Sequence, residues 1–210
     1  MYKKLFPPAA VLLFIIFIST GCQNARRAAQ LPAADGENGW FAGHEGDAAE
    51  LAGIYPLTEE NPFIIASYEE LIGHLKHGAG VVAFGFDECP RCKNAFPVLE
   101  KAFYEMGMDR HAGFRGRIVY YNIFGDREED NERYRAIVDI LKDSLGSDEN
   151  GDPRIYVPDV FFISSGKVVG NHLDTVPSLE DPWESLSGEQ AAELMGIYMD
   201  LMEKLDDCDC

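Results

Sequence analysis

The chain has 210 residues, of which 46% are hydrophobic and 26% are charged, and its formal net charge at pH 7 is −18. All of the acidic residues lie in residues 35–210. This part holds 36 Asp and Glu residues against 14 Lys and Arg residues, a net charge of −22. Such a surface repels phosphate backbones and anionic lipid headgroups. We therefore expect no nucleic-acid partner.

Residues 1–21 have the composition of an export signal. Lys3 and Lys4 precede an apolar stretch over residues 5–18, and about 14 apolar residues are fewer than the roughly 20 of a spanning helix. The stretch is followed closely by Gly21 and Cys22, which resembles the bacterial lipoprotein box. That resemblance implies cleavage before Cys22, its acylation, and a cell-membrane lipoprotein facing the extracytoplasmic side. An uncleaved anchor and plain secretion are the alternatives.

The next segment, residues 22–53, is rich in Ala and Gly and has no sustained apolar period. This composition is typical of a flexible tether. We therefore expect one folded domain over residues 54–205, which is long enough to bury its own core. An acidic tail over residues 206–210 would follow it.

Within the domain, strand and helix patterns alternate. Strands are expected over residues 62–66, 81–86, 117–124, 158–163 and 168–170. Helices are expected over residues 67–78, 90–106, 128–145 and 187–205, with a polar loop over 147–154. Ser67 and Glu70 have the spacing of a capping box, and the unbroken apolar run 81–86 indicates a strand buried on both faces. Pro97 is expected to kink its helix without ending it.

Cys89 and Cys92 stand directly after the strand 81–86, at the start of the next helix. Two intervening residues allow the sulfurs to close a ring, and a helix N-terminus favours thiolate over thiol. Because the thiolate is the form that attacks disulfides, the spacing predicts a dithiol switch. Cys89 is the expected nucleophile, partly exposed, and Cys92 the resolving thiol. A buried, inert pair and half of a zinc site are the alternatives.

The residues around the two cysteines are expected to tune the redox poise. Pro90 and Arg91 lie between the sulfurs, and Arg91 adds a positive charge near the Cys89 thiolate, which favours a more oxidising disulfide. Asp87 and Glu88 oppose this if they point toward Cys89, but solvent screens exposed charges. We therefore expect the helix and Arg91 to dominate.

The order of elements, with the dithiol between the second strand and its helix, resembles that of the thioredoxin superfamily. The resemblance is carried by the aromatic-rich strand that leads into the run 89–92, by Pro97, by the Val157-Pro158 step and by the turn at Gly166. It implies an α/β, thioredoxin-like fold with a central mixed β-sheet flanked by helices. It also implies a thiol-disulfide oxidoreductase. Within the superfamily, the runs 85–92 and 120–123 are similar to a small exported group of bacteriocin transport accessory and disulfide-isomerase-like proteins.

The same resemblance assigns further residues. Pro158 corresponds to a cis-proline that faces the dithiol, and Val157 would offer backbone groups to an extended substrate chain. One position departs from the pattern, because many relatives carry a buried acid six residues before the first cysteine, where this chain has Ala83. Slower resolution or a water-mediated proton route should follow.

The expected partners are protein thiols or disulfides and a membrane or soluble redox partner, with the membrane reached through the lipid anchor. No cofactor and no metal are expected, since the redox-active disulfide carries the electrons. Two other functions are open: a copper or zinc carrier that uses Cys89, Cys92, Cys208 and Cys210, and a non-enzymatic docking lipoprotein.

Cys208 and Cys210 stand in the acidic tail. They are interpreted either as a shuttle dithiol that exchanges electrons with the first pair or as an exposed pair without a catalytic part. The five histidines show no ligand spacing with any cysteine and are expected at the surface.

Overall fold

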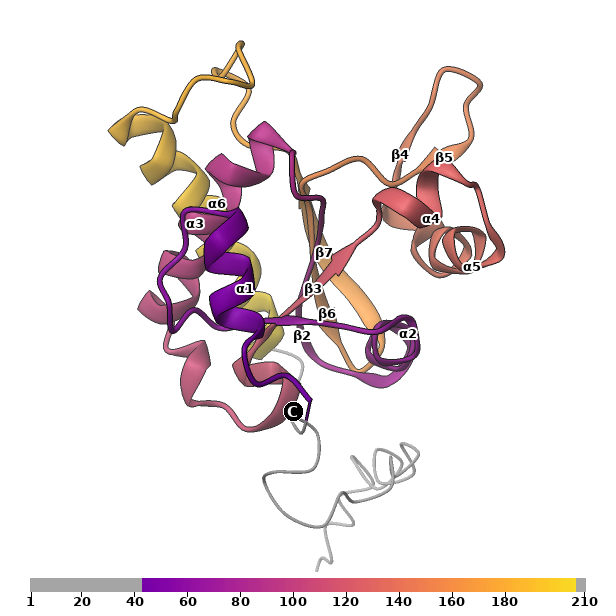
Figure 1. The fold of residues 1–210 in the computed structure, drawn as a ribbon, viewed down its shortest axis with the longest axis horizontal. Coiled ribbons are helices and arrows are strands. Elements are labelled where there is room, and N and C mark those ends of the chain that lie inside the picture. Colours follow the sequence, from indigo (N-terminus) through magenta and orange to yellow (C-terminus); the bar gives the residue numbers. More distant parts are fainter. Residues whose placement is uncertain (1–42, 207–210) are drawn as a thin grey trace, which may run out of the picture. The chain divides into compact units, whose positions relative to one another are not determined.

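A computed structural model describes residues 43–206, with the side chain of Asp206 excepted. The described residues form a five-stranded mixed sheet with helices on both faces (Figure 1). The export signal, the lipidation site Cys22 and the pair Cys208 and Cys210 lie outside the described residues.

The strands of the main sheet are β1 (Phe63–Ile65), β2 (Gly80–Gly85), β3 (Ile118–Asn122), β6 (Asp159–Ser164) and β7 (Lys167–Leu173). Their order across the sheet is β1-β3-β2-β6-β7. β1 and β2 run parallel to β3, whereas β6 is antiparallel to both β2 and β7. Every residue of β2 and β6 is buried, as expected for strands with neighbours on both sides and helices on both faces. The expected α/β architecture with a central mixed sheet is confirmed.

The helices divide between the two faces of the sheet (Figure 1). One face carries α1 (Asp47–Ile54), α3 (Pro90–Glu105) and α6 (Gly188–Asp206), and the other carries α2 (Tyr68–His77), α4 (Phe124–Glu128) and α5 (Glu132–Leu141). The smaller elements are η2 (Met108–Arg110), η3 (Gly113–Gly116), η4 (Lys142–Ser144), β4 (Gly146–Ser147) and β5 (Pro153–Arg154). Among residues 43–206, no helix combines the length and the hydropathy needed to cross a membrane.

The alternation of side chains along β2 produces two separate cores. Val81 and Ala83 belong to the cluster on the α3 and α6 face, and Val82 and Phe84 belong to the cluster on the α2 and α5 face. Both cysteines of the dithiol are part of the first cluster. The dithiol therefore lies on the α3 face, at the end of the central strand β2.

The prediction of a flexible tether over residues 22–53 is wrong for its last part. Residues 47–54 form α1, in which Leu51 is fully buried. The carboxylate of Asp47 accepts a hydrogen bond of 2.7 Å from the Ile65 N–H group, which fixes the helix to β1. A short helix with one buried leucine shows no apolar period, so the sequence pattern gave no sign of α1, although its leucine is part of the core.

The expected helix over residues 128–145 is also corrected, because the chain breaks within it. Asp130 has a φ of 44°, and the side chain of Asn131 accepts the Tyr134 N–H group at 3.0 Å, so α5 begins at Glu132. The expected polar loop over 147–154 contains β5, which pairs with β4. A good N-cap residue inside an amphipathic pattern thus restarts the helix.

Other local predictions are confirmed. Ser67 and Glu70 form a complete capping box at the start of α2, and α3 continues through Pro97 to Glu105. Ser165 and Gly166 form the turn between β6 and β7, both with positive φ. A Cβ atom on Gly166 would collide with the Lys76 carbonyl group, so this turn requires glycine.

Candidate functional site

Cys89 is the N-cap residue of α3. Its backbone is extended, and its Sγ atom accepts the N–H group of Cys92 at 3.1 Å. Pro90 occupies the first helical turn, where a missing N–H group is tolerated. Cys89 and Cys92 form a disulfide, with Cα atoms 5.2 Å apart. The expected position of Cys89 at the start of the helix is confirmed, and a backbone N–H group of the first turn is directed at its sulfur.

The prediction that Cys89 is partly exposed is wrong. Cys89 is 2% exposed and Cys92 is fully buried. The cause is the segment before β6, because the Val157 carbonyl oxygen lies 3.9 Å from the Cys89 Sγ atom and Val157 packs against the cluster that contains both cysteines. Access to the sulfur is therefore restricted by a neighbouring loop.

Val157 and Pro158 lie beside the dithiol, although 68 residues separate Val157 from Cys89 in the chain. The Val157–Pro158 peptide bond is cis, in agreement with the sequence expectation. The Pro158 carbonyl oxygen accepts the Asp174 N–H group at 2.7 Å, which connects this segment to the loop after β7. The role of Val157 and Pro158 in holding a substrate chain stays a prediction.

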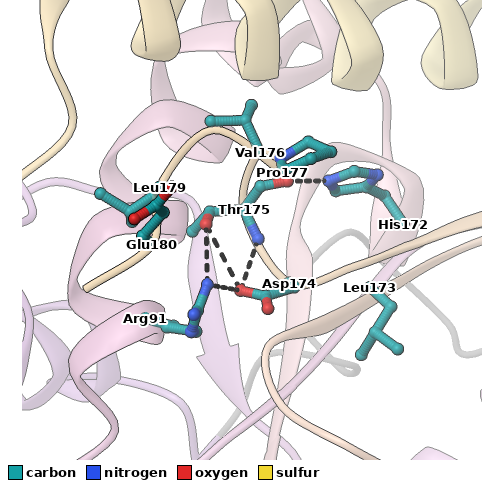
Figure 2. Close-up of a pocket in the computed structure, with 9 residues that line it drawn as sticks. All are labelled: Arg91, His172, Leu173, Asp174, Thr175, Val176, Pro177, Leu179 and Glu180. Carbon is teal, nitrogen blue, oxygen red and sulfur yellow. Dashed lines mark hydrogen bonds and ion pairs between the residues drawn. The ribbon is translucent and has the colours of Figure 1, made fainter. Parts of the chain in front are cut away.

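The side chain of Arg91 reaches the loop after β7 (Figure 2). Its Nη1 atom donates to Asp174 Oδ1 at 2.9 Å and lies 3.5 Å from Thr175 Oγ1. The Arg91 side chain is 25% exposed and that of Asp174 is 43% exposed. The tuning of the Cys89 thiolate by Arg91 stays a prediction, and the structure adds that an acid, Asp174, is paired with the guanidinium.

A pocket of about 410 Å³ adjoins this ion pair (Figure 2). Its lining consists of Arg91, His172, Leu173, Asp174, Thr175, Val176, Pro177, Leu179 and Glu180. The pocket thus combines aliphatic side chains with the ion pair and an exposed carboxylate. Arg91 is the residue of the dithiol motif that lines this pocket, and neither cysteine is among the lining residues.

The acids that precede Cys89 are exposed to solvent. Asp87 accepts a hydrogen bond of 3.0 Å from the Asn122 side chain at the end of β3. Exposed charges are screened by salt and water. The negative charges of Asp87 and Glu88 therefore disfavour the Cys89 thiolate less than the helix N-terminus favours it.

Ala83 is fully buried on the α3 face, so the acid of the superfamily pattern is absent from that position. The nearest buried acid along β6 is Asp159, whose pKa burial raises to about 7, against a hydrogen bond from Asn171 that lowers it. The Asn171 amide donates both to Asp159 and to the Ser144 carbonyl group in η4. Asp159 therefore belongs to the α5 side of the sheet and does not replace the acid missing at Ala83.

Within residues 43–206, no group of three or more His, Cys, Asp and Glu side chains is arranged to hold a metal ion. Cys208 and Cys210, which the metal-carrier hypothesis and the shuttle hypothesis both require, lie outside the described residues. Both hypotheses therefore stay untested.

Comparison of the chain with models of known protein families and with curated protein sequences finds no match. Function is therefore inferred from the geometry of the site. The site contains a closed dithiol with one sulfur at a helix N-terminus, an adjacent backbone carbonyl group and an adjoining pocket. Such an arrangement is suited to thiol-disulfide exchange.

Proposed function

We propose that this chain is a membrane-tethered, extracytoplasmic thiol-disulfide oxidoreductase with a thioredoxin fold. The observation that carries the proposal is the environment of the Cys89 sulfur, which accepts the Cys92 N–H group at 3.1 Å and lies 3.9 Å from the Val157 carbonyl oxygen. The N–H group favours the thiolate, and the carbonyl group belongs to the segment that would align a substrate chain.

The thioredoxin fold is supported by the position of the dithiol between β2 and α3 and by Pro97 within that helix. It is further supported by the Val157-Pro158 step, which immediately precedes β6. In the five-stranded sheet, β6 and β7 extend from β2 as an antiparallel pair, and the parallel strands lie on its other side.

The proposed exchange balances in two steps. A substrate thiolate attacks the Cys89 sulfur, the Cys89–Cys92 bond breaks, and Cys92 leaves as a thiolate that takes up a proton. A second substrate thiolate then attacks the substrate sulfur of the mixed disulfide, and Cys89 leaves. The substrate loses two electrons and two protons, which the dithiol gains, and the reverse sequence reduces a substrate disulfide. Because Cys89 is 2% exposed, the segments around it must move outward during the attack.

The test uses single cysteine variants with a model protein disulfide as substrate. Cys89→Ser should abolish exchange, because it removes the attacking sulfur. Cys92→Ser should accumulate a mixed disulfide through Cys89, because the resolving thiol is absent. Non-reducing electrophoresis and peptide mass spectrometry identify the adduct. A mixed disulfide that forms through Cys92 in the Cys89→Ser variant would reverse the assignment, and wild-type protein without exchange activity would refute the proposed function.

The direction of electron flow follows from the reduction potential of the Cys89/Cys92 couple. A value of about −270 mV corresponds to a thioredoxin-like reductant, and a value of about −120 mV to a strong oxidant. Equilibration with glutathione buffers, followed by alkylation and mass spectrometry, measures it. The Arg91–Asp174 ion pair argues against the oxidising extreme, since it leaves little positive charge for the thiolate.

The proposed location depends on residues 1–22, which lie outside the described residues. Mass spectrometry of the membrane fraction should detect a lipid-modified peptide that begins at Cys22. An unmodified Cys22 inside a longer peptide that contains Leu12 would instead show an uncleaved anchor.

A further inference from the structure

We infer that Asp174 is a positioning residue that engages the Arg91 guanidinium and thereby makes the dithiol less oxidising. This inference rests on the proposed function, because it concerns the redox poise of the same two sulfurs. It assigns a role to a residue that stands 82 positions after Cys92 and outside the dithiol motif.

Asp174 joins three segments of the site. Its N–H group donates to the Pro158 carbonyl oxygen at 2.7 Å, and its Oδ1 atom accepts the Thr175 N–H group at 2.8 Å. The same Oδ1 atom accepts from Arg91 Nη1 at 2.9 Å (Figure 2). A single residue therefore connects the dithiol helix, the segment before β6 and the loop after β7.

The backbone of Asp174 has a φ of 74°, in the left-handed region that favours glycine. A non-glycine residue there is disfavoured, although Asp tolerates it better than most residues. Glycine would relieve the backbone but would provide no carboxylate for Arg91. The position thus accepts a conformational cost and presents an acid to the residue between the two cysteines.

The sign of the effect follows from the charges. A positive charge near Cys89 stabilises its thiolate, and stabilisation of the reduced form makes the disulfide a stronger oxidant. Asp174 offsets the Arg91 charge and fixes the guanidinium in the pocket. Removal of the Asp174 carboxylate should therefore lower the pKa of the Cys89 thiol and shift the equilibrium toward the reduced dithiol.

The experiment compares wild-type protein, Asp174→Asn, Arg91→Met and the double variant, each equilibrated with glutathione buffers. Asp174→Asn should shift the equilibrium constant toward the reduced form about three- to tenfold, as expected for an unbalanced charge several Å from the sulfur. Arg91→Met alone leaves the Asp174 carboxylate without its partner, so it should shift the equilibrium constant the other way, toward the oxidised form, by less than about threefold, because this side chain is 43% exposed and its charge is screened. In the Arg91→Met background, Asp174→Asn should have a smaller effect, because it removes a screened carboxylate and frees no guanidinium to approach the sulfur. The pKa of Cys89, from the pH dependence of thiolate absorbance, should follow the same order.

Two further variants keep the test decisive. Asp174→Gly removes the carboxylate but suits the positive φ, so it should reproduce the shift even if Asp174→Asn perturbs the loop. Glu180→Gln removes an acid that lines the same pocket but makes no hydrogen bond or ion pair with Arg91, and it should have the smaller effect. An equal shift in Glu180→Gln, no shift in either Asp174 variant, or an undiminished shift in the Arg91→Met background would overturn the inference. The glutathione equilibrium needs no protein substrate, so a failure of the proposed function would be seen separately, as absence of exchange with protein disulfides.

Discussion

Tyr55 and Tyr120 form a buried pair on the α3 face of the sheet. Their hydroxyl groups are 2.9 Å apart, and both rings contact Phe96, which stands one helical turn after Cys92. Burial raises the pKa of Tyr120 to about 12 and that of Tyr55 further, so both hydroxyls stay neutral in the physiological range. The pair therefore supports the helix that carries Cys92 and supplies no charged acid or base for the dithiol.

The tyrosine pair gives a double-mutant prediction. Tyr55→Phe should reduce the free energy of unfolding by about 1–2 kcal/mol, because it leaves the buried Tyr120 hydroxyl without its partner. Tyr120→Phe should reduce the free energy of unfolding by a similar amount, because it leaves the Tyr55 hydroxyl without its partner. The double variant should cost less than the sum of the two, since it removes both polar groups. Urea denaturation monitored by circular dichroism measures all three, and additive losses would show that the two hydroxyls are not coupled.

At the scale of elements, the junction of β2 and α3 depends on Gly85. A Cβ atom at this position would lie 2.9 Å from the Phe96 ring and 3.1 Å from the Tyr120 ring. Phe96 has little room to retreat, because Tyr55 and Phe63 pack against it with ring centroids 4.9 and 5.6 Å away. Glycine is thus required where the strand passes beneath the helix that holds the dithiol.

Gly85→Ala should therefore lower the free energy of unfolding by about 1–3 kcal/mol through overpacking. Gly73→Ala is the matched control, because Gly73 lies inside α2 with no atom within 4 Å of an added Cβ. That substitution should instead stabilise the protein by up to about 1 kcal/mol through helix propensity. Thermal and urea denaturation of both variants provide the comparison. Equal effects would mean that the contact with Phe96 does not constrain the junction.

Local signals predicted the elements that carry strong patterns. The capping box of Ser67 and Glu70 and the apolar run before Cys89 depend on neighbouring residues, so the sequence was sufficient for α2 and β2. The helix α1 was missed because its contact is tertiary, with one buried leucine as its only mark. The break before α5 was missed because the apolar period continues across the N-cap Asn131.

The residues of the candidate site likewise fall into those that local sequence identified and those that depend on tertiary contacts. Cys89, Cys92 and the cis bond at Pro158 were identified from short motifs and a family resemblance. The engagement of Arg91 by Asp174 could not be predicted, because it depends on the pairing of β6 with β7, which places Leu173 opposite Asp159 and starts the next loop beside the dithiol. The burial of Cys89 likewise depends on Val157, which approaches only in the folded sheet.

At the scale of the whole molecule, two buried titratable groups, His74 and Asp159, contribute to stability with opposite dependences on pH. Burial lowers the pKa of His74 to about 4, and neither ring nitrogen has a hydrogen-bond partner among the described residues. The expectation that His74 is a surface residue is wrong, since it is 4% exposed and packs against Phe114. Asp159, in contrast, has its pKa raised to about 7 by burial, against the hydrogen bond from Asn171. The two groups respond to pH with opposite signs.

The signs follow from proton uptake in the folded and unfolded states. Between about pH 6.5 and 4 the unfolded chain protonates His74 but the folded chain does not, so the contribution of His74 to stability falls as the pH falls. Between about pH 7 and 4 the folded chain keeps Asp159 protonated but the unfolded chain does not, so the contribution of Asp159 rises as the pH falls. Each contribution is on the order of 3–4 kcal/mol, and together they nearly cancel.

Single variants should therefore show a dependence of the free energy of unfolding on pH that nearly cancels in the wild-type protein. Asp159→Asn resembles the protonated acid and can keep the hydrogen bond from Asn171, so it should stabilise the protein at pH 8 and lose this advantage toward pH 4. His74→Phe removes the buried imidazole, so its advantage over wild type should grow from pH 7 to pH 4. His77→Gln, at an exposed position of the same helix, is the control and should leave the wild-type profile unchanged. Urea denaturation at half-unit pH intervals measures the differences. Parallel profiles for wild type and both variants would show that neither group titrates differently in the folded and unfolded states.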